Sequence, residues 1–254
     1  MKIITYNLNG IRSALRKGFD KWLAQAQPDI VAIQELKARP EQIDDKIFHD
    51  LGYKTYWFSA EKPGYSGVGL LTKPQPDNVI FGIGDEFFDK EGRLIRADYG
   101  DVTLINAYFP SGSSSDHRQQ IKMQWLELFR KFVNELKKER PKLIICGDFN
   151  ICRLWIDIHN PEGHVNVSGF LPEEREWFAQ LIEDGFIDAF REFNKEPEQY
   201  TWWSFRQRSR ERNKGWRIDY HLITPDLKPK LKNVSILKDV VHSDHCPVEM
   251  EIEI

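Results

Sequence analysis

Short runs of β-branched and aliphatic residues recur along the whole chain, and they constrain its fold more than any other feature. Nine runs are typical of strands, because each is rich in Val, Ile, Leu or Tyr and is short. They cover residues 2–8, 29–34, 67–72, 94–99, 102–109, 143–146, 217–224, 234–237 and 247–254. Strands pair with one another because unpaired backbone groups are costly to bury. The sequence therefore predicts a protein built on β-sheets.

Three amphipathic segments between these runs predict helices. The clearest carries apolar residues at helical spacing over residues 121–136 and ends before Pro141. A second begins with Pro172 and stops at Gly185, and a third covers about residues 18–27. Many strands and few helices indicate an α/β fold, namely a four-layer sandwich of two packed mixed β-sheets flanked by helices.

Composition narrows the class of protein further. Hydrophobic residues make up 41% of the 254 residues, which is enough for a core, and no apolar run approaches the roughly 20 residues of a membrane span. Three cysteines without a Cys-x-x-Cys pair support neither a disulfide framework nor a zinc knuckle. Without a repeat, linker or signal peptide, we expect one domain over residues 1–254, a monomer, no membrane partner and a cytoplasmic location.

The charge is unevenly distributed along the chain. The net charge of −3 excludes a protein that coats nucleic acid through overall basicity. Between Thr201 and Arg217, however, six basic residues accompany a single acidic residue, Glu211. The sequence therefore predicts one positively charged strip in an otherwise acidic protein.

Polar side chains follow four of the apolar runs at the point where each run ends. Asn7 and Asn9, and likewise Asp148 and Asn150, are two residues apart, so each pair projects from one face of an extended segment. Any one of these residues alone is also typical of a turn. Together, acids, amides and an imidazole without zinc spacing predict a site for a hard cation, with Mg²⁺ fitting better than Zn²⁺. The residues are Asn7, Asn9, Gln34, Glu35, Asp148, Asn150, Ser243, Asp244 and His245.

A site of this kind suits the cleavage of a phosphodiester bond. The transition state gathers negative charge and a water must lose a proton, which a cation and nearby carboxylates favour. Asp219 lies within an apolar strand, so we expect it to have a partner. No nucleophile elbow, P-loop or complete Gly-x-Gly-x-x-Gly motif competes with this interpretation.

Nine short blocks spread over the whole chain form one ordered set. They are Tyr6-Asn7-Leu8-Asn9-Gly10, Gln34-Glu35, Gly64-Tyr65-Ser66-Gly67-Val68, Asn106-Ala107-Tyr108, Gly147-Asp148-Phe149-Asn150, Ser168-Gly169-Phe170-Leu171-Pro172, Thr201-Trp202-Trp203, Gly215-Trp216-Arg217-Ile218-Asp219-Tyr220 and Ser243-Asp244-His245. In order and spacing this set resembles the exonuclease III family of abasic-site endonucleases, within the endonuclease/exonuclease/phosphatase superfamily. The resemblance implies the DNase I-like form of the four-layer sandwich.

The resemblance also implies an activity. It points to a Mg²⁺-dependent DNA repair phosphodiesterase, with Mn²⁺ as a possible substitute, that cleaves the backbone 5′ to abasic sites. A 3′-5′ exonuclease or 3′-end-trimming activity is expected beside it. The implied partner is double-stranded DNA with abasic or damaged 3′ sites.

Roles for individual residues follow from the same resemblance. Glu35 holds the metal, with Asn9 and Asp244 near it, and Asn9 stands where some members of the family have Asp. Asp148 is implied to orient or deprotonate the water, and Asn150 to support Asp148. His245, polarised by Asp219, is implied to act on a phosphate oxygen. Tyr108 and Asn7 are implied to hold the phosphate.

Selection of the substrate is expected from aromatic and basic residues. Trp202, Trp216 and Ile218 match the family's apolar pocket for a flipped baseless sugar, although Trp202 and Trp203 are alternatively core residues. Tyr65, in a Gly-flanked loop, is expected to touch the DNA backbone. Phosphate contacts without sequence readout are expected from Arg206, Arg208, Arg210 and Arg212.

The chain departs from the family pattern in two places. Arg153 replaces the usual His after the catalytic Asp148, and Trp155 stands where an acidic or small residue is common. Residues 111–115 carry no cation, so an arginine that some relatives insert into DNA is absent. Two alternatives remain open: a hydrolase of the same fold acting on RNA or an inositol phosphate, and a DNA-binding homologue with impaired catalysis.

Overall fold

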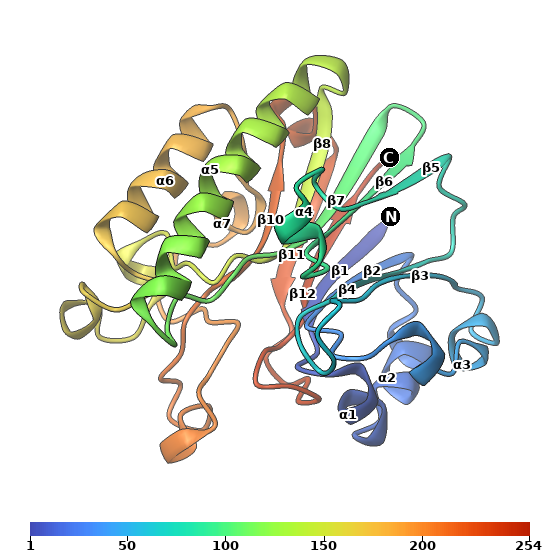
Figure 1. Cartoon of the computed structure of the whole chain (residues 1–254), viewed down its shortest axis with the longest axis horizontal. Coiled ribbons are helices and arrows are strands. Elements are labelled where there is room, and N and C mark those ends of the chain that lie inside the picture. The colour runs from blue at the N-terminus through green and yellow to red at the C-terminus, as the bar shows by residue number, and fades with distance from the viewer.

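The structure is a computed structural model that describes residues 1–254. Two six-stranded β-sheets pack face to face, and helices cover their outer faces (Figure 1). This arrangement confirms the four-layer α/β sandwich expected from the strand count.

The first sheet contains both the first and the last strand of the chain. Most of its neighbours are antiparallel, but β1 and β2 run parallel, so the sheet is mixed. In spatial order its strands are β11 (Leu231–Ile236), β12 (Val248–Ile252), β1 (Lys2–Asn7), β2 (Ile30–Gln34), β4 (Val68–Thr72) and β3 (Lys54–Phe58).

The second sheet is mixed in the same way, with β7 and β8 parallel. Tyr108 lies opposite Asp148 in that pair, and Asp148 lies opposite Asp219 on the neighbouring antiparallel strand. Its strands are, in spatial order, β5 (Asn78–Phe81), β6 (Leu94–Tyr99), β7 (Val102–Tyr108), β8 (Lys142–Asp148), β10 (Asp219–Ile223) and β9 (Ile187–Asp188).

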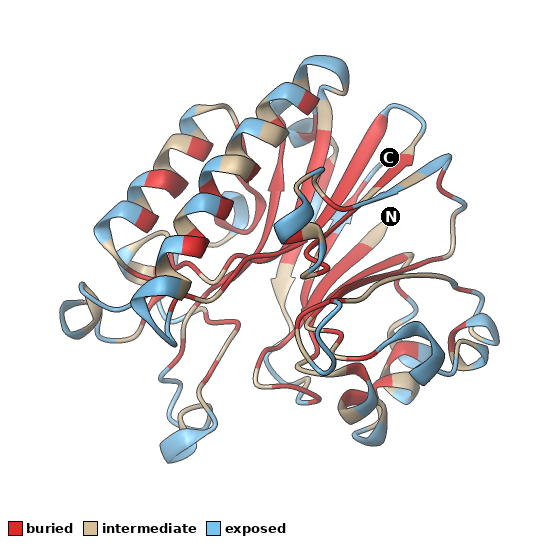
Figure 2. Cartoon of the chain, viewed as in Figure 1, coloured by how far each residue is buried: buried red, intermediate tan, exposed pale blue.

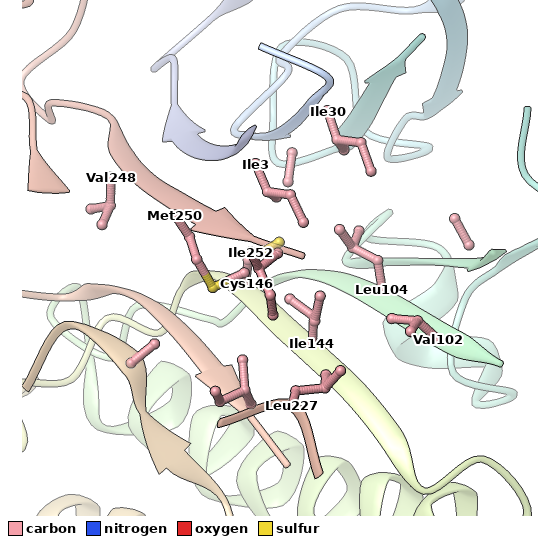
Figure 3. Packing of buried hydrophobic residues seen from close by; sticks show 14 of the residues in the cluster. Ile3, Ile30, Val102, Leu104, Ile144, Cys146, Leu227, Val248, Met250 and Ile252 are labelled. Carbon is pink, nitrogen blue, oxygen red and sulfur yellow. The ribbon is translucent and has the colours of Figure 1, made fainter. Parts of the chain in front are cut away.

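The main core lies between the two sheets. Figure 3 shows Ile3 and Ile30 of the first sheet facing Leu104 and Ile144 of the second. These side chains are fully buried or nearly so, and they belong to one cluster of 21 buried residues. Burying apolar area of this extent is the main force that holds the two sheets together.

Helices cover the outer faces with their buried sides turned towards the sheets (Figure 2). The longest, α5 (Asp116–Glu139), begins where the Ser115 side chain accepts a hydrogen bond from the backbone N–H of Arg118, and it ends before Pro141. None of the helices combines the length and apolar character needed to cross a membrane. The other helices are α1 (Ile11–Arg16), α2 (Phe19–Ala26), α3 (Lys46–His49), α4 (Glu86–Asp89), α6 (Pro172–Glu183) and α7 (Ala189–Phe193).

All nine predicted strands and all three predicted helices are present, with shifted ends. The sequence interpretation missed three strands, β3, β5 and β9, and four helices of four to six residues. The short helices have too few turns to show an apolar period. β3 and β5 are edge strands and β9 has only two residues, so tertiary contacts rather than a local pattern define them.

Candidate active site

The ends of β1, β2, β8 and β10 meet at one edge of the sandwich and bring the predicted polar residues together. Asn7 is the centre of this group: its Nδ2 donates to Asp148 Oδ2 at 2.8 Å and to Glu35 Oε1 at 2.9 Å. Asn7 and Asp148 come from different sheets and both are buried. The amide thus joins two carboxylates that are far apart in sequence.

Three of the site residues have an unusual backbone conformation. Asn9, Glu35 and Asn150 have φ values of 47°, 51° and 52°, in the left-handed region that non-glycine residues rarely adopt. Each follows the end of a strand, where the chain turns out of the sheet. Strained residues of this kind persist where surrounding contacts fix them, and they concentrate at functional sites.

Asp219 has the partner that its buried position required. His245 Nδ1 donates to Asp219 Oδ2 at 2.8 Å, and the Thr201 hydroxyl donates to the same oxygen at 2.6 Å. The other ring nitrogen, Nε2, lies 3.9 Å from Asp148 Oδ2. The carboxylate therefore fixes the orientation of the imidazole and directs Nε2 towards the centre of the site.

The two buried carboxylates and the imidazole shift one another's protonation. Burial, together with the charge of Asp219, raises the pKa of Asp148. Burial alone would lower the pKa of His245, but the adjacent carboxylate of Asp219 outweighs it and raises that pKa to about 10. His245 is therefore a cation at neutral pH and can donate a proton or a hydrogen bond to an oxyanion.

Acidic and amide oxygens form a cluster that suits a hard cation. Carboxylate oxygens of Glu35 and Asp148 lie within 4.8 Å of each other and of a ring nitrogen of His245, which as a cation is a neighbour of the cluster and not a ligand. Asn9 Nδ2 donates to Asp244 Oδ1 at 2.9 Å, which places these two predicted ligands side by side.

A positively charged group already lies against this cluster. The Lys37 ammonium lies 2.6 Å from Glu35 Oε2 and 2.5 Å from Asn9 Oδ1. These carboxylate and amide oxygens are of the kind that Mg²⁺ takes as ligands. Lys37 was not anticipated from the sequence, although it lies two residues after Glu35.

The polar group opens into a pocket of about 280 Å³. Trp202, Trp216 and Ile218, which the sequence placed in an apolar pocket, all line it. The rings of Trp202 and Trp216 meet edge to face at 89°, with centroids 6.0 Å apart. Trp202 Nε1 also donates to Asp244 Oδ2 at 3.0 Å, whereas Trp203 is 4% exposed and belongs to the core. The remaining lining residues are Glu35, Tyr108, Ser111, Ser113, Asn150, Val167, Ser168, Gly169, Asp244 and His245.

Tyr108 and Tyr65 lie together beside this pocket, linked by a buried arginine. The Arg93 guanidinium lies over the Tyr108 ring, 5.0 Å from its centroid, and donates to the Tyr65 hydroxyl at 3.0 Å. Arg118 donates to the same hydroxyl at 2.7 Å, and Glu91 accepts hydrogen bonds from both arginines. Sequence reasoning missed Arg93, Arg118 and Glu91, because no motif distinguishes them from surface charges.

The predicted arginine strip divides into two parts. Arg206, Arg208 and Arg212 are exposed on a loop that projects at the lower left in Figure 1. Arg210 differs: it lies over the Trp203 ring at 4.6 Å and donates to the backbone carbonyls of Lys238, Val240, Ser243 and His245. The terminal nitrogens of Arg210 hold two loops of the protein together, so of the four predicted phosphate contacts this one has the least free hydrogen-bonding capacity.

The strip also carries less free charge than the sequence indicated. Arg217 is 1% exposed and forms ion pairs with Asp157 and Asp188, at 2.8 Å and 2.6 Å.

A second group of cations lies on the other side of the site. Arg12 and Arg16 line a polar groove of about 390 Å³ together with Asn9 and Lys37. These cations were missed because the sequence shows no basic run there.

The two departures from the family pattern differ in their relation to the pocket: Ser111 and Ser113 line it, whereas Arg153 and Trp155 do not. Arg153 lies 3.9 Å from Asp188, towards the buried ion pairs behind the site. Trp155 is 47% exposed and meets the Phe170 ring edge to face at 5.8 Å. Arg153 and Trp155 thus contact groups outside the pocket.

Comparison with known proteins gives a consistent result. The sequence matches the Endonuclease/Exonuclease/phosphatase family over residues 4–245. An exodeoxyribonuclease of Bacillus subtilis (strain 168) is 40% identical over 256 residues, with 100% of each chain covered. An AP endonuclease structure from Archaeoglobus fulgidus has a TM-score of 0.91 at 32% identity, with 100% of each chain covered. A Neisseria 3′ phosphatase bound to a product DNA hairpin also has a TM-score of 0.91, at 30% identity and with 100% of each chain covered.

Proposed function

Because the chain belongs to the Endonuclease/Exonuclease/phosphatase family, and within it to the exonuclease III type of abasic-site endonuclease, we propose that it cleaves the DNA backbone 5′ to abasic sites with Mg²⁺ as cofactor. It is a hydrolase of phosphodiester bonds and a nuclease of the DNA repair type. The finer proposal concerns the bond that is cut, the metal, and a second activity that trims 3′ ends.

One observation carries the proposal. A carboxylate with a raised pKa, Asp148, faces a protonated imidazole, His245, across 3.9 Å, and His245 lines a pocket with aromatic walls. Hydrolysis of a phosphodiester needs a group that accepts a proton from water and a group that stabilises charge on phosphate oxygens. These two side chains supply both functions in one place.

The cation would be held by Glu35, with Asn9 and Asp244 or Asp148 close enough to take part. When bound, Mg²⁺ supplies positive charge that stabilises the phosphate in the transition state. Mn²⁺ prefers the same oxygen donors and is expected to replace it.

Asp148 orients the attacking water and takes its proton. Its Oδ1 accepts from the backbone N–H of Asn150 at 2.8 Å and its Oδ2 from Asn7 at 2.8 Å, so both oxygens are held in fixed directions. A raised pKa makes the carboxylate a better base than an ordinary aspartate. His245 donates to a non-bridging oxygen of the phosphate, and Asp219 keeps it protonated.

Substrate choice follows from the pocket and the cations around it. A pocket of about 280 Å³ lined by Trp202, Trp216 and Ile218 suits a sugar without its base, and ordinary nucleotides are excluded by size. Exposed arginines on one side and Arg12 and Arg16 on the other bind phosphates of the duplex on both sides of the scissile bond. The proposed partner is therefore double-stranded DNA with an abasic or damaged 3′ site.

A labelled duplex with one abasic analogue tests the proposal, with the same duplex lacking the lesion as control. In Mg²⁺ we expect a single nick that leaves a 3′-hydroxyl on the upstream fragment. Chelator should abolish the nick, and Mg²⁺ or Mn²⁺ should restore it. Retention of the lesion duplex without a nick in Mg²⁺ would contradict the proposal, as would equal cleavage of the control.

A further inference from the structure

Lys122 and Glu174 form an ion pair that is completely buried and that the chemistry above does not use. Lys122 Nζ lies 2.5 Å from Glu174 Oε1, both side chains are 0% exposed, and the pair joins α5 to α6. Burying two charges is costly, and apolar residues of the same volume often stabilise a protein at least as well. Stability alone therefore does not account for this pair, and the groups that it holds indicate another role.

The lysine end of the pair holds the turn that follows the catalytic aspartate. Lys122 Nζ donates to the backbone carbonyl of Asn150 at 2.8 Å. Asn150 is in the left-handed conformation, and its N–H donates to Asp148 Oδ1 at 2.8 Å. The ammonium thus fixes a strained peptide one hydrogen bond away from the proposed base.

The glutamate end holds the wall of the pocket. Glu174 Oε2 accepts from the backbone N–H groups of Gly169 and Leu171, at 2.6 Å and 3.0 Å. Gly169 lines the pocket, and its φ of +98° is accessible mainly to glycine. A Cβ at Gly169 would lie 2.8 Å from the Trp216 ring and 3.1 Å from the Asn150 carbonyl oxygen, so these three groups are in close contact.

We propose that the buried Lys122–Glu174 pair is a positioning element that locks the Asp148 to Asn150 turn against the Gly169 wall, and so sets the distance between the attacking water and the bound sugar. The inference rests on the proposed function for its kinetic consequence. Its structural content, the coupling of turn and wall through α5 and α6, does not depend on the substrate.

The kinetic consequence follows from the geometry. Neither Lys122 nor Glu174 lines the pocket or belongs to the cluster proposed to hold the metal ion, so the pair cannot act on the substrate directly. A shift of about 1 Å in a catalytic group can lower a rate on the order of 100-fold, even when the mutated residue is remote. Loosening the turn should therefore reduce kcat while KM changes little.

The double variant Lys122→Met/Glu174→Gln tests this, because it removes both charges and leaves no unpaired ion in the interior. We expect kcat on the abasic duplex to fall by on the order of 10- to 100-fold, with KM within about threefold of the wild-type value. Hydrogen exchange should become faster in peptides covering residues 148–152 and 167–171. Thermal unfolding of the variant confirms that it is folded before these measurements.

The matched control is Arg130→Met/Asp184→Asn. Arg130 Nε lies 2.6 Å from Asp184 Oδ2, so this pair also joins α5 to the C-terminal end of α6. It makes no contact with the turn or with the pocket wall. We expect this variant to keep the wild-type kcat and the wild-type exchange in both peptides.

The outcomes separate the inference from the proposed function. If the wild-type protein does not nick the abasic duplex, the proposed function fails, and the exchange data alone decide about the positioning role. Unchanged exchange in both peptides overturns the inference whatever the activity. A kcat equal to that of the wild type, or a loss of the same size in the control, overturns it as well.

Discussion

At the scale of single residues, the site works because neighbouring groups set one another's protonation and direction. His245 would be neutral if burial acted alone, and Asp219 makes it a cation by a hydrogen bond of 2.8 Å. Asn7 holds two carboxylates with one amide nitrogen. Arg210 shows that a count of basic residues does not by itself predict a DNA-binding surface, because its guanidinium donates to backbone carbonyls of the protein.

Replacing Asp219 by Asn tests the first of these relations. The amide keeps the shape of the carboxylate but neither holds the imidazolium nor fixes its tautomer, so the nicking rate should fall on the order of 10²- to 10⁴-fold. Affinity for the abasic duplex in chelator should stay within about threefold of the wild-type value. A single-turnover rate within threefold of the wild type would show that His245 does not depend on this partner.

At the scale of elements, the two sheets are also joined by polar contacts. Gln34 Nε2 donates to Asn106 Oδ1 at 2.7 Å, and Asn106 Nδ2 donates to the Gly69 carbonyl at 2.8 Å. His221 of β10 donates from Nε2 to the carbonyl of Val248 on β12, at 3.0 Å. These contacts fix the register of one sheet on the other, which aligns the strand ends at the site.

His221 makes stability depend on pH in a defined direction. Burial lowers its pKa from about 6.5 to about 4, so the unfolded chain binds a proton more readily than the folded protein. The stabilising contribution is complete above pH 6.5 and is lost as the pH falls towards 4. Between pH 7.5 and pH 5 this residue should cost about 2 kcal/mol in the free energy of unfolding.

Urea unfolding of the wild type and of His221→Gln at both pH values measures this contribution. The difference between the two proteins should change by about 2 kcal/mol on going from pH 7.5 to pH 5, because only in the wild type does the unfolded chain bind a proton at this position that the folded protein excludes. Parallel pH curves for the two proteins would mean that His221 is not buried in its neutral form.

The elements differ in how far the sequence determines them. Runs such as residues 2–8 and 143–146 are predictable because a buried strand is apolar throughout, and the polar residues that follow them are visible for the same reason. β5 is not predictable in this way: it is a four-residue edge strand, defined by its pairing with β6. Within the site, Asp148 and His245 stand in recognisable motifs, whereas Arg93 and Lys122 acquire their roles only through contacts distant in sequence.

At the scale of the whole molecule, the distribution of free cations defines a face for DNA. Figure 1 shows the loop of Arg206 to Arg212 and helix α1 at the same lower edge, with the segment that carries Asp244 and His245 between them. Since the net charge is −3, nonspecific attraction by the rest of the surface is weak. Affinity for DNA should therefore depend on few residues and on salt.

The triple variant Arg206→Ala/Arg208→Ala/Arg212→Ala tests this distribution. Binding to duplexes with and without the lesion should weaken alike, and the slope of log K against log salt should become shallower by up to about 3 units. Lys228→Ala/Lys230→Ala/Lys232→Ala is the control with the same loss of charge, since these residues follow β10 at the end opposite Asp219. An equal change of slope in the control would contradict a localised DNA face.

The central claim is that separate strand ends form one hydrolytic site around Asp148, and Asp148→Asn tests it most directly. Both the affinity of this variant for an abasic duplex in chelator and its single-turnover nicking rate in Mg²⁺ should be measured. We predict an affinity within about threefold of the wild-type value and a rate lower by roughly 10³-fold or more. A variant that nicks the duplex at close to the wild-type rate would contradict the account.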